Sequence, residues 1–379
     1  MEVLVTGGAG FIGSHIADRL LSEGNSVSIL DSLDVQVHPH SIPDYIPKAA
    51  KFYKTDVRNK DELNSLLEDV DVVVHCAAAV GVAQSLYRVR HYLDVNVVGT
   101  ATLLEVLIER KHPLHRLIVL TSMTGYGEGL YRRLSDGHLV RPGIRTEEGV
   151  QKWGWEPVCP ETKEKLEPVP TPEDADLMAK NVYALSKRYQ AELSLHLGDF
   201  YDFPVVCFRL FNVYGPRQSL SNPYTGVLAI FLSRILSGQS PIIYEDGGQT
   251  RDFVSVHDIV NAVMLSLKSD AANGTIMNLG SGIPRSIKEV ARTLAHMLKE
   301  QDIEPQVTDQ FRKGDVRHCY ADISRANKLL GYKPAVEWED GLSELIEWAR
   351  QAPTTDQFDK AEKELREHGL LSKRSSKSN

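Results

Sequence analysis

The sequence lacks the features that mark membrane proteins, nucleic-acid-binding proteins and disulfide-stabilised secreted proteins. No apolar run approaches the length of a membrane-spanning helix. The 379 residues carry a formal net charge of −8, which argues against a nucleic acid or an anionic membrane as the main partner. The four cysteines are scattered and form no C-x-x-C pair, which indicates reduced thiols in a cytoplasmic protein. They are Cys76, Cys159, Cys207 and Cys319.

What the sequence does contain is the composition of a large globular protein with alternating strand and helix signals. Hydrophobic residues make up 42% and charged residues 25% of a chain long enough for two lobes. The alternation predicts an α/β fold with a doubly wound parallel sheet, which binds its ligands at the carboxyl ends of the strands. The expected strands are 3–5, 26–30, 51–54, 71–75, 117–120 and 205–210.

A glycine-rich motif directly follows the first expected strand. Gly7, Gly10 and Gly13 have G-x-x-G-x-x-G spacing and lead into a helix-compatible run whose N-terminus can hold phosphates. Asp31 ends the second strand about twenty residues later, where a carboxylate accepts ribose hydroxyls and repels a 2′-phosphate. The motif therefore predicts a Rossmann-type unit that prefers NAD to NADP. Its candidate cofactor-binding residues are Gly7, Gly10, Phe11, Ile12, Gly13 and Asp31.

The alternation of strand and helix signals, and the places where it changes, divide the chain into three parts. Residues 1–211 form the predicted dinucleotide-binding domain, which a proline-rich and charged insertion at about 127–176 interrupts. Residues 212–353 are expected to form mainly a smaller C-terminal α/β lobe that binds the substrate. The tail at 354–379 begins with alternating charges from 356 to 367, which predict a solvated helix face, and its last ten residues are expected to be disordered.

A tyrosine and a lysine one helical turn apart supply the second motif. Tyr183 and Lys187 stand at positions i and i+4 of a helix predicted from about 180 to 201, so their side chains share one face. The ammonium group is expected to favour phenolate and to lower the pKa of the tyrosine toward that of a general base. Ser122 closes the fifth strand, where its hydroxyl can bond the same substrate oxygen. These three residues predict a redox site.

The ordered motifs resemble the extended short-chain dehydrogenase/reductase family, and within it the nucleotide-sugar epimerases and dehydratases. The resemblance covers about residues 1–350 and is carried by TGGAGFIGSH, HCAA, DVNVVGT, TSMTGYG, YALSK, RLFNVYGPRQ, GGQTRDFVSVHDIV, NLGSG and RKGDVRH. It implies that Asp56 and Val57 flank the adenine and that Lys187 also bonds the nicotinamide ribose. The remaining residues that it assigns are Ala77, Ala78 and Asn96 for the cofactor, and Asn212, Arg251 and Arg312 for the sugar and its diphosphate.

The residues after Ser122 bear on the reaction. Dehydratases of the family carry an Asp-Glu pair there, whereas this chain has Met123 and Thr124, which cannot supply that acid and base. The resemblance therefore implies a 4-epimerase of a dTDP- or UDP-hexose, similar to dTDP-L-rhamnose 4-epimerases and UDP-glucose 4-epimerases, with Thr124 among its catalytic residues. Two alternatives stay open, namely a nucleotide-sugar dehydratase with another acid–base pair and a catalytically idle NAD(H)-sensing protein.

The resemblance also implies features of the insertion and of the assembly. The insertion lies between Ser122 and Tyr183, which favours a lid over the substrate. Some relatives carry a cysteine knuckle near Cys159, but Thr162 stands where the second cysteine would be, so we expect no metal. A homodimer is expected, in which the helical stretches 95–107 and 183–197 pair with their copies.

Overall fold

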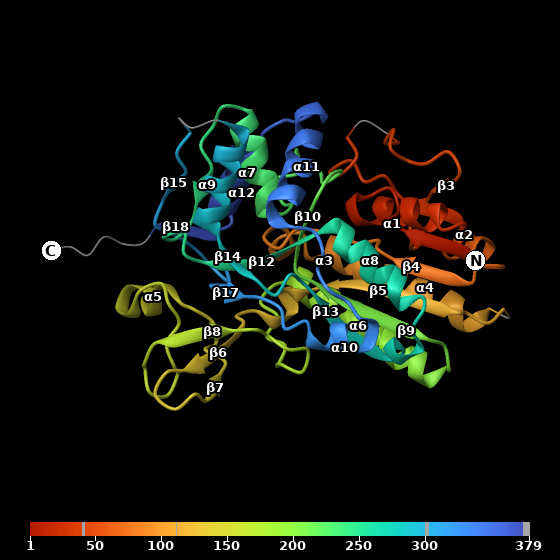
Figure 1. The fold of residues 1–379 in the computed structure, drawn as a ribbon, viewed down its shortest axis with the longest axis horizontal. Coiled ribbons are helices and arrows are strands. Elements are labelled where there is room, and N and C mark those ends of the chain that lie inside the picture. The colour runs from red at the N-terminus through yellow and green to blue at the C-terminus, as the bar shows by residue number, and fades with distance from the viewer. Residues whose placement is uncertain (40–41, 111, 300–302, 374–379) are drawn as a thin grey trace.

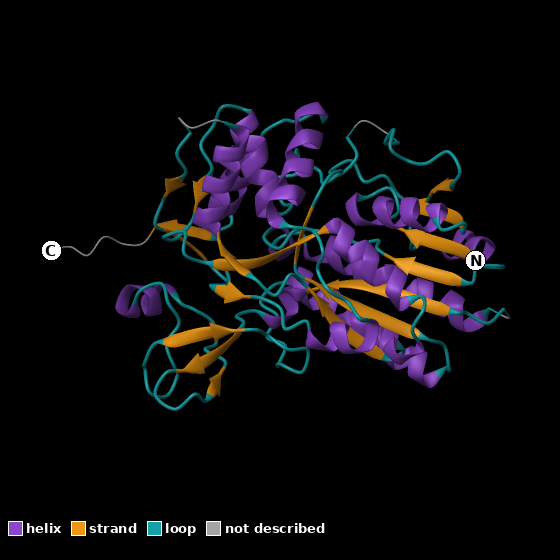
Figure 2. Ribbon diagram, in the orientation of Figure 1, coloured by secondary structure: helices purple, strands orange, loops and turns teal. Residues whose placement is uncertain are grey.

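The larger lobe, at the right of Figures 1 and 2, is built on a parallel sheet of seven strands. The computed structural model describes residues 1–39, 42–110, 112–299 and 303–373. The strand order is β13-β9-β5-β4-β1-β2-β3, so the winding direction reverses between β1 and β4, and this confirms the predicted doubly wound sheet. The strands are β1 (Glu2–Thr6), β2 (Ser26–Asp31), β3 (Lys51–Lys54), β4 (Val72–His75), β5 (Arg116–Ser122), β9 (Val205–Leu210) and β13 (Thr275–Leu279).

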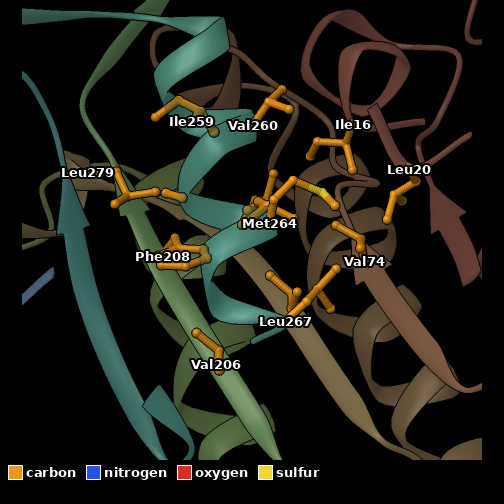
Figure 3. Packing of buried hydrophobic residues seen from close by; sticks show 14 of the residues in the cluster. Ile16, Leu20, Val74, Val206, Phe208, Ile259, Val260, Met264, Leu267 and Leu279 are labelled. Atoms are coloured by element: carbon orange, nitrogen blue, oxygen red, sulfur yellow. The ribbon is translucent and has the colours of Figure 1, made fainter. Parts of the chain in front are cut away.

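Helices cover both faces of this sheet because successive strand residues point to opposite sides. Val3 and Val5 pack in a cluster with α1 (Phe11–Ser22), α8 (Val256–Ser266) and α10 (Ser324–Leu330). Leu4 packs in a second cluster with α2 (Lys60–Leu66), α4 (Gly99–Glu109) and α6 (Val182–Phe200). Figure 3 shows the first cluster, in which the apolar side chains of α8 lie between those of α1 and those of β9 and β13. None of the described helices is long and apolar enough to cross a membrane.

The second lobe is a smaller α/β unit, but it does not include everything after residue 211. Its four-stranded sheet contains β10 (Asn212–Tyr214), β12 (Thr250–Ser255), β14 (Pro284–Ser286) and β17 (His318–Cys319). Three helices, α7 (Val227–Leu236), α9 (Ile287–Leu298) and α11 (Trp338–Gln351), share its apolar core. Strand β13 and helices α8 and α10 follow residue 211 in the chain but pack in the first lobe. The sequence alone does not indicate that β13, which lies far beyond residue 211, pairs with β9 of the first lobe.

The insertion forms its own small unit, seen at the lower left of Figure 1. Strands β6 (Leu130–Arg133), β7 (Leu139–Val140) and β8 (Leu166–Val169) pair antiparallel, and α5 (Glu147–Trp153) lies between β7 and β8 in the chain. The predicted absence of a long helix is confirmed. The small sheet was not predicted, because its strands are short and β8 itself contains Pro168.

The tail is more ordered than the sequence predicts. Helix α12 (Phe358–Glu367) has an exposed charged face, but its opposite face is docked, since Ala361 and Leu365 are buried. The last ten residues are not wholly disordered, since β18 (Leu371–Lys373) pairs antiparallel with β16 (Gln310–Arg312). Residues 374–379, which the same prediction covers, lie outside the described part. Charge alternation gave no sign of this docking, because the apolar contacts of α12 come from only a few positions.

Candidate functional site

A cavity of about 420 Å³ opens at the carboxyl ends of the central strands. Both lobes contribute to its wall, and β1, β2, β4 and β5 each end beside it. Most of the residues predicted from the sequence line it, which places them in one site. They are Gly7, Gly10, Phe11, Ile12, Gly13, Asp31, Asp56, Val57, Ala77, Ala78, Ser122, Tyr183, Lys187 and Asn212.

The glycine motif has the geometry that a pyrophosphate requires. Gly7 has a positive φ of +66°, and a Cβ atom there would lie 2.7 Å from the amide nitrogen of Ala77. A Cβ atom on Gly13 would lie 2.3 Å from the carbonyl oxygen of Gly7, so the start of α1 packs directly on the turn. Gly10 precedes α1 without a side chain that caps the helix. The first amides of this 12-residue helix therefore remain available to an anion in the cavity.

Asp31 and Asp56 place carboxylates beside that turn. The Asp31 side chain, at the end of β2, accepts hydrogen bonds from the amides of Ala9 at 3.0 Å and Leu33 at 2.9 Å. These bonds fix a buried carboxylate in the wall, where it can meet ribose hydroxyls and disfavours a 2′-phosphate. Asp56 accepts from the Arg58 side chain at 2.8 and 2.7 Å, and these bonds lower the pKa of its carboxyl group. The residues present thus fit NAD.

The catalytic candidates meet where β5 ends and α6 begins. Asn181 caps α6 by accepting a hydrogen bond from the amide of Ala184 at 2.8 Å, which starts the helix just before Tyr183. Tyr183 and Ser122 both line the cavity, where the Ser122 side chain acts to lower the pKa of the Tyr183 phenol. Thr124 Oγ1 donates to Ser122 Oγ at 3.0 Å, so Thr124 reaches the site through Ser122 rather than lining the cavity.

The electrostatics of this group differ from the prediction in one respect. Burial raises the pKa of Tyr183 to about 12, and the effect that opposes burial is the hydrogen bond with Ser122, not the charge of Lys187. Lys187 Nζ donates to the Leu120 carbonyl oxygen at 2.9 Å, and burial lowers its pKa to about 8. The predicted lowering of the tyrosine pKa is therefore wrong, because desolvation of the phenolate outweighs the other contributions.

Asn96 and His75 support the wall without lining it. Asn96 accepts from the amide of Ala79 at 2.7 Å and donates to the Ala79 carbonyl at 3.1 Å, so it holds a residue that lines the cavity. The structure thus places Asn96 behind the predicted cofactor site. His75 is bonded to Thr6 at 2.8 Å and to Thr100 at 2.9 Å, and burial lowers its pKa to about 3, which keeps the ring neutral.

The two predicted diphosphate ligands meet at one carboxylate away from the cavity wall. Arg251 Nη2 lies 3.1 Å from Asp315 Oδ1, and Arg312 Nη2 lies 2.9 Å from Asp315 Oδ2. The two guanidinium groups help to hold the pKa of Asp315 at about 2. The sequence placed both arginines in the second lobe correctly, but it gave no sign that Asp315 joins them.

The second-lobe wall contains polar groups that suit a ligand. Asn212 Oδ1 and Gln218 Oε1 are buried without a hydrogen-bond partner, and both residues line the cavity. A buried carbonyl oxygen without a partner is costly, so a hydroxyl or amide of a ligand would satisfy it. Asn212 was predicted from the sequence, whereas Gln218 was not. Gln36, Gln84 and Asn222, which also line the cavity, were missed because they lie in loops outside any recognisable pattern.

A buried ion-pair network connects the insertion to the second lobe and was also missed. Arg145 of the insertion lies 3.0 Å from Glu128 and 2.7 Å from Glu245. Arg317 lies 2.9 Å from Glu245, and its backbone amide donates to Glu128 at 2.9 Å. Within the described ranges, no group of three or more His, Cys, Asp or Glu side chains could hold a metal ion.

Family comparisons agree with this geometry. Residues 3–143 match the model of the NAD dependent epimerase/dehydratase family, and residues 165–345 match that of GDP-mannose 4,6 dehydratase. The chain is 34% identical to dTDP-L-rhamnose 4-epimerase of Burkholderia thailandensis, covering 92% of this chain and 95% of that protein. It is 31% identical to a putative UDP-glucose 4-epimerase of Methanocaldococcus jannaschii, with coverage of 92% and 98%.

Solved structures give the same result. UDP-glucose 4-epimerase of Thermotoga maritima, with UDP-glucose, superposes with a TM-score of 0.75 at 28% identity, covering 93% of this chain and 99% of that chain. UDP-glucuronic acid 4-epimerase of Bacillus cereus, in complex with UDP-glucuronic acid and NAD, superposes with a TM-score of 0.73 at 26% identity and the same coverage.

Proposed function

This chain belongs to the NAD-dependent epimerase/dehydratase family, and we propose that it is a nucleotide-sugar 4-epimerase acting on a dTDP- or UDP-hexose through a transient 4-keto sugar. The observation that carries the proposal is that Ser122, Tyr183 and Lys187 lie in the wall of the same cavity as the glycine turn and Asp31. The two residues after Ser122 are Met123 and Thr124, which leaves oxidation and reduction at one carbon as the chemistry of this site.

The chain holds its cofactor with the groups already described. NAD, when bound, supplies a reversible acceptor for the hydrogen and the electron pair that leave C4 of the sugar. The amides at the start of α1 would hold its diphosphate, and Asp31 would accept its adenosine ribose hydroxyls. Lys187, Asp56 and Val57 line the rest of its path, while Asn96 keeps Ala79 in place.

Tyr183 is the group that would remove the proton from the sugar 4-hydroxyl. As that O–H bond breaks, the C4–H bond breaks and a C4 carbonyl forms, so a base must touch the oxygen. Ser122 would orient the same oxygen. Lys187 is buried one helical turn away, and the positive charge of the bound nicotinamide would stabilise phenolate. Return of the hydrogen to the opposite face of the rotated sugar would give the C4 epimer.

The second lobe would hold the nucleotide sugar. Asn212 offers its unpartnered carbonyl oxygen to the sugar. Arg251 and Arg312 remain proposed diphosphate ligands, because guanidinium groups match phosphate with paired donors. Each would have to exchange or share its bond with Asp315 when the diphosphate binds.

We also propose a homodimer that acts in the cytoplasm. Helix α6 exposes Leu185 and Tyr189, and Val98 is exposed directly before α4, so apolar side chains gather on the helices expected to pair. All four cysteines are free thiols, as a reducing compartment favours. Light scattering at micromolar concentration should give twice the chain mass, and a monomer mass would contradict the dimer.

The proposed function is tested by incubating the purified protein with dTDP- and UDP-linked hexoses and separating C4 epimers by chromatography. We expect interconversion of one epimeric pair without added NAD and without net formation of NADH, because the cofactor is restored in each turnover. Release of water with formation of a 4-keto-6-deoxy sugar would instead support the dehydratase alternative. The absence of any turnover across the panel would support the NAD(H)-sensing alternative.

A further inference from the structure

Helix α12 is fixed against the second lobe by contacts at its first turn. Phe358 stacks with Tyr244, with ring centroids 6.5 Å apart, and the Arg234 guanidinium lies 4.6 Å from the centre of the Phe358 ring. Arg234, on α7, also lies 3.2 Å from the carboxylates of Asp356 and Asp359. In Figure 1, α12 accordingly lies beside α7. A helix held in this way can present a side chain at a defined position.

The chain that follows α12 fixes its other end. Strand β18 pairs with β16, and the amide of Lys313 donates to the Leu370 carbonyl at 3.2 Å. Arg366 donates to Gln310 Oε1 at 3.1 Å. Because β16 ends at Arg312, the tail is attached to the same strand as a proposed diphosphate ligand.

The buried face of α12 presents Glu364 to two tyrosines from different lobes. Tyr87 donates to Glu364 Oε2 at 2.8 Å, Tyr224 donates to the same oxygen, and the two phenol oxygens are 2.8 Å apart. The ring of His368, one turn further along, stacks on Tyr87 at 4.2 Å. Hydrogen bonds with the phenols lower the pKa of Glu364, while burial raises the pKa of Tyr87 to about 12. One carboxylate therefore faces two neutral donors.

These tyrosines connect Glu364 to the cavity wall through a closed circuit. The amide of Tyr87 donates to the Gln84 carbonyl at 3.2 Å, and the amide of Tyr224 donates to Asn222 Oδ1 at 3.0 Å. Gln36 accepts from Gln84 at 3.0 Å and donates to Asn222 at 3.3 Å. The members of this circuit are Glu364, Tyr87, Gln84, Gln36, Asn222 and Tyr224. Gln36, Gln84 and Asn222 line the cavity itself.

We propose that Glu364 is a positioning residue for the nucleotide-sugar subsite. By accepting from Tyr87 and Tyr224, it holds the first-lobe turn at 84–87 and the second-lobe loop at 220–226 in the separation that the nucleotide needs. The C-terminal segment is then part of the substrate site although it touches no reacting atom. Without Glu364, the two loops must be ordered by the ligand, and that ordering reduces affinity. This inference rests on the proposed function, because it assumes a nucleotide sugar in that half of the cavity.

The test is Glu364→Ala in the full chain with its NAD content confirmed. We expect UDP or dTDP, whichever the parent binds more tightly, to bind about tenfold more weakly by calorimetry. The KM of the nucleotide sugar should rise by the same factor, with kcat within about twofold of the parent. Glu364→Gln retains an acceptor oxygen and should recover part of the loss. Glu367→Ala is the matched control, because Glu367 is on the same helix and its ion pair is with Lys363, at 3.9 Å.

A double variant of the two tyrosines distinguishes a positioning role of Glu364 from a general loss of stability. In a Tyr87→Phe/Tyr224→Phe protein, Glu364→Ala should cause no further loss of affinity, because the hydroxyl groups it holds are already absent. A parent that binds neither UDP nor dTDP would contradict the proposed function, and the inference would fall with it. A parent that binds and turns over, together with a Glu364→Ala protein of unchanged affinity, would overturn the inference alone. An equal loss in the double-phenylalanine background would also overturn it.

Discussion

The two walls of the cavity are built in different ways. The first-lobe wall uses residues close together in sequence, since the glycines lie within one turn and Tyr183 and Lys187 lie one helical turn apart. The second-lobe wall uses loop residues such as Asn222, which contacts Gln36 186 positions away. The proposed redox chemistry therefore lies on regular elements, whereas the proposed substrate subsite is assembled from distant segments. Four predictions test that division.

The largest effect is expected in the first-lobe wall. Tyr183→Phe removes the proposed base and should lower kcat by roughly 10²- to 10⁴-fold, while nucleotide affinity changes little. Steady-state turnover should be measured on protein whose bound NAD has been confirmed. Tyr201→Phe, which alters an exposed tyrosine directly after the same helix, serves as the control. Activity within a few-fold of the parent would place the proton transfer elsewhere.

A smaller effect is expected where the first lobe selects its cofactor. Asp31→Ala removes a charged acceptor from the ribose hydroxyls, and such bonds correspond to roughly 10- to 100-fold in affinity. We expect NAD to bind more weakly and discrimination against NADP to relax. Asp31→Asn provides a comparison, since it keeps one acceptor oxygen for the amides of Ala9 and Leu33. Titration of the cofactor-free protein gives both dissociation constants, and an unchanged ratio would refute the role.

The second-lobe wall should respond in affinity rather than in turnover. Arg251→Gln removes one guanidinium from the proposed diphosphate contact and should raise the KM of the nucleotide sugar about tenfold, with kcat nearly unchanged. Because Arg251 also donates to the Val316 carbonyl at 2.6 Å, the unfolding temperature must be recorded for the same samples. A fall in kcat at constant KM would remove Arg251 from the binding role.

The ion-pair network between the insertion and the second lobe should affect the stability of the protein without affecting its affinity for the nucleotide sugar. Arg145→Met leaves the buried carboxylates of Glu128 and Glu245 with fewer partners, and breaking a buried pair typically costs about 3–5 kcal/mol of unfolding free energy. Arg317 retains part of the network, so we expect the lower end of this range in chemical denaturation. Arg188→Met, which breaks an exposed pair with Glu192, is the control. Equal stability of both variants would contradict a structural role for the insertion's ion pairs.

What the sequence could predict follows the same division. The glycine turn, Asp31 and the Tyr183–Lys187 pair were predictable because each depends on spacing within one strand, turn or helix. The seven-stranded sheet was predictable except for β13. This strand pairs with β9 only because the chain comes back to the first lobe after passing through the second.

The parts of the fold and of the site that were not predicted depend on contacts between residues far apart in the sequence, which no local pattern indicates. Glu364 belongs to a helix whose charges alternate like those of a solvated surface, yet its carboxylate meets Tyr87 and Tyr224. Arg251 and Arg312 were recognised, but their shared partner Asp315 was not. The pKa of Tyr183 depends on how completely the phenol is buried, and burial is a property of the fold.

In the proposed reaction one carbon of the sugar, C4, is oxidised and reduced within a single turnover at the Ser122–Tyr183–Lys187 site. This is tested most directly with a nucleotide hexose that carries deuterium at C4, incubated in ordinary water and analysed by mass spectrometry and NMR. We expect both C4 epimers to keep the deuterium at C4 and to gain no hydrogen from solvent at that carbon. Loss of the label to solvent, or exchange at C5 with loss of water, would contradict it.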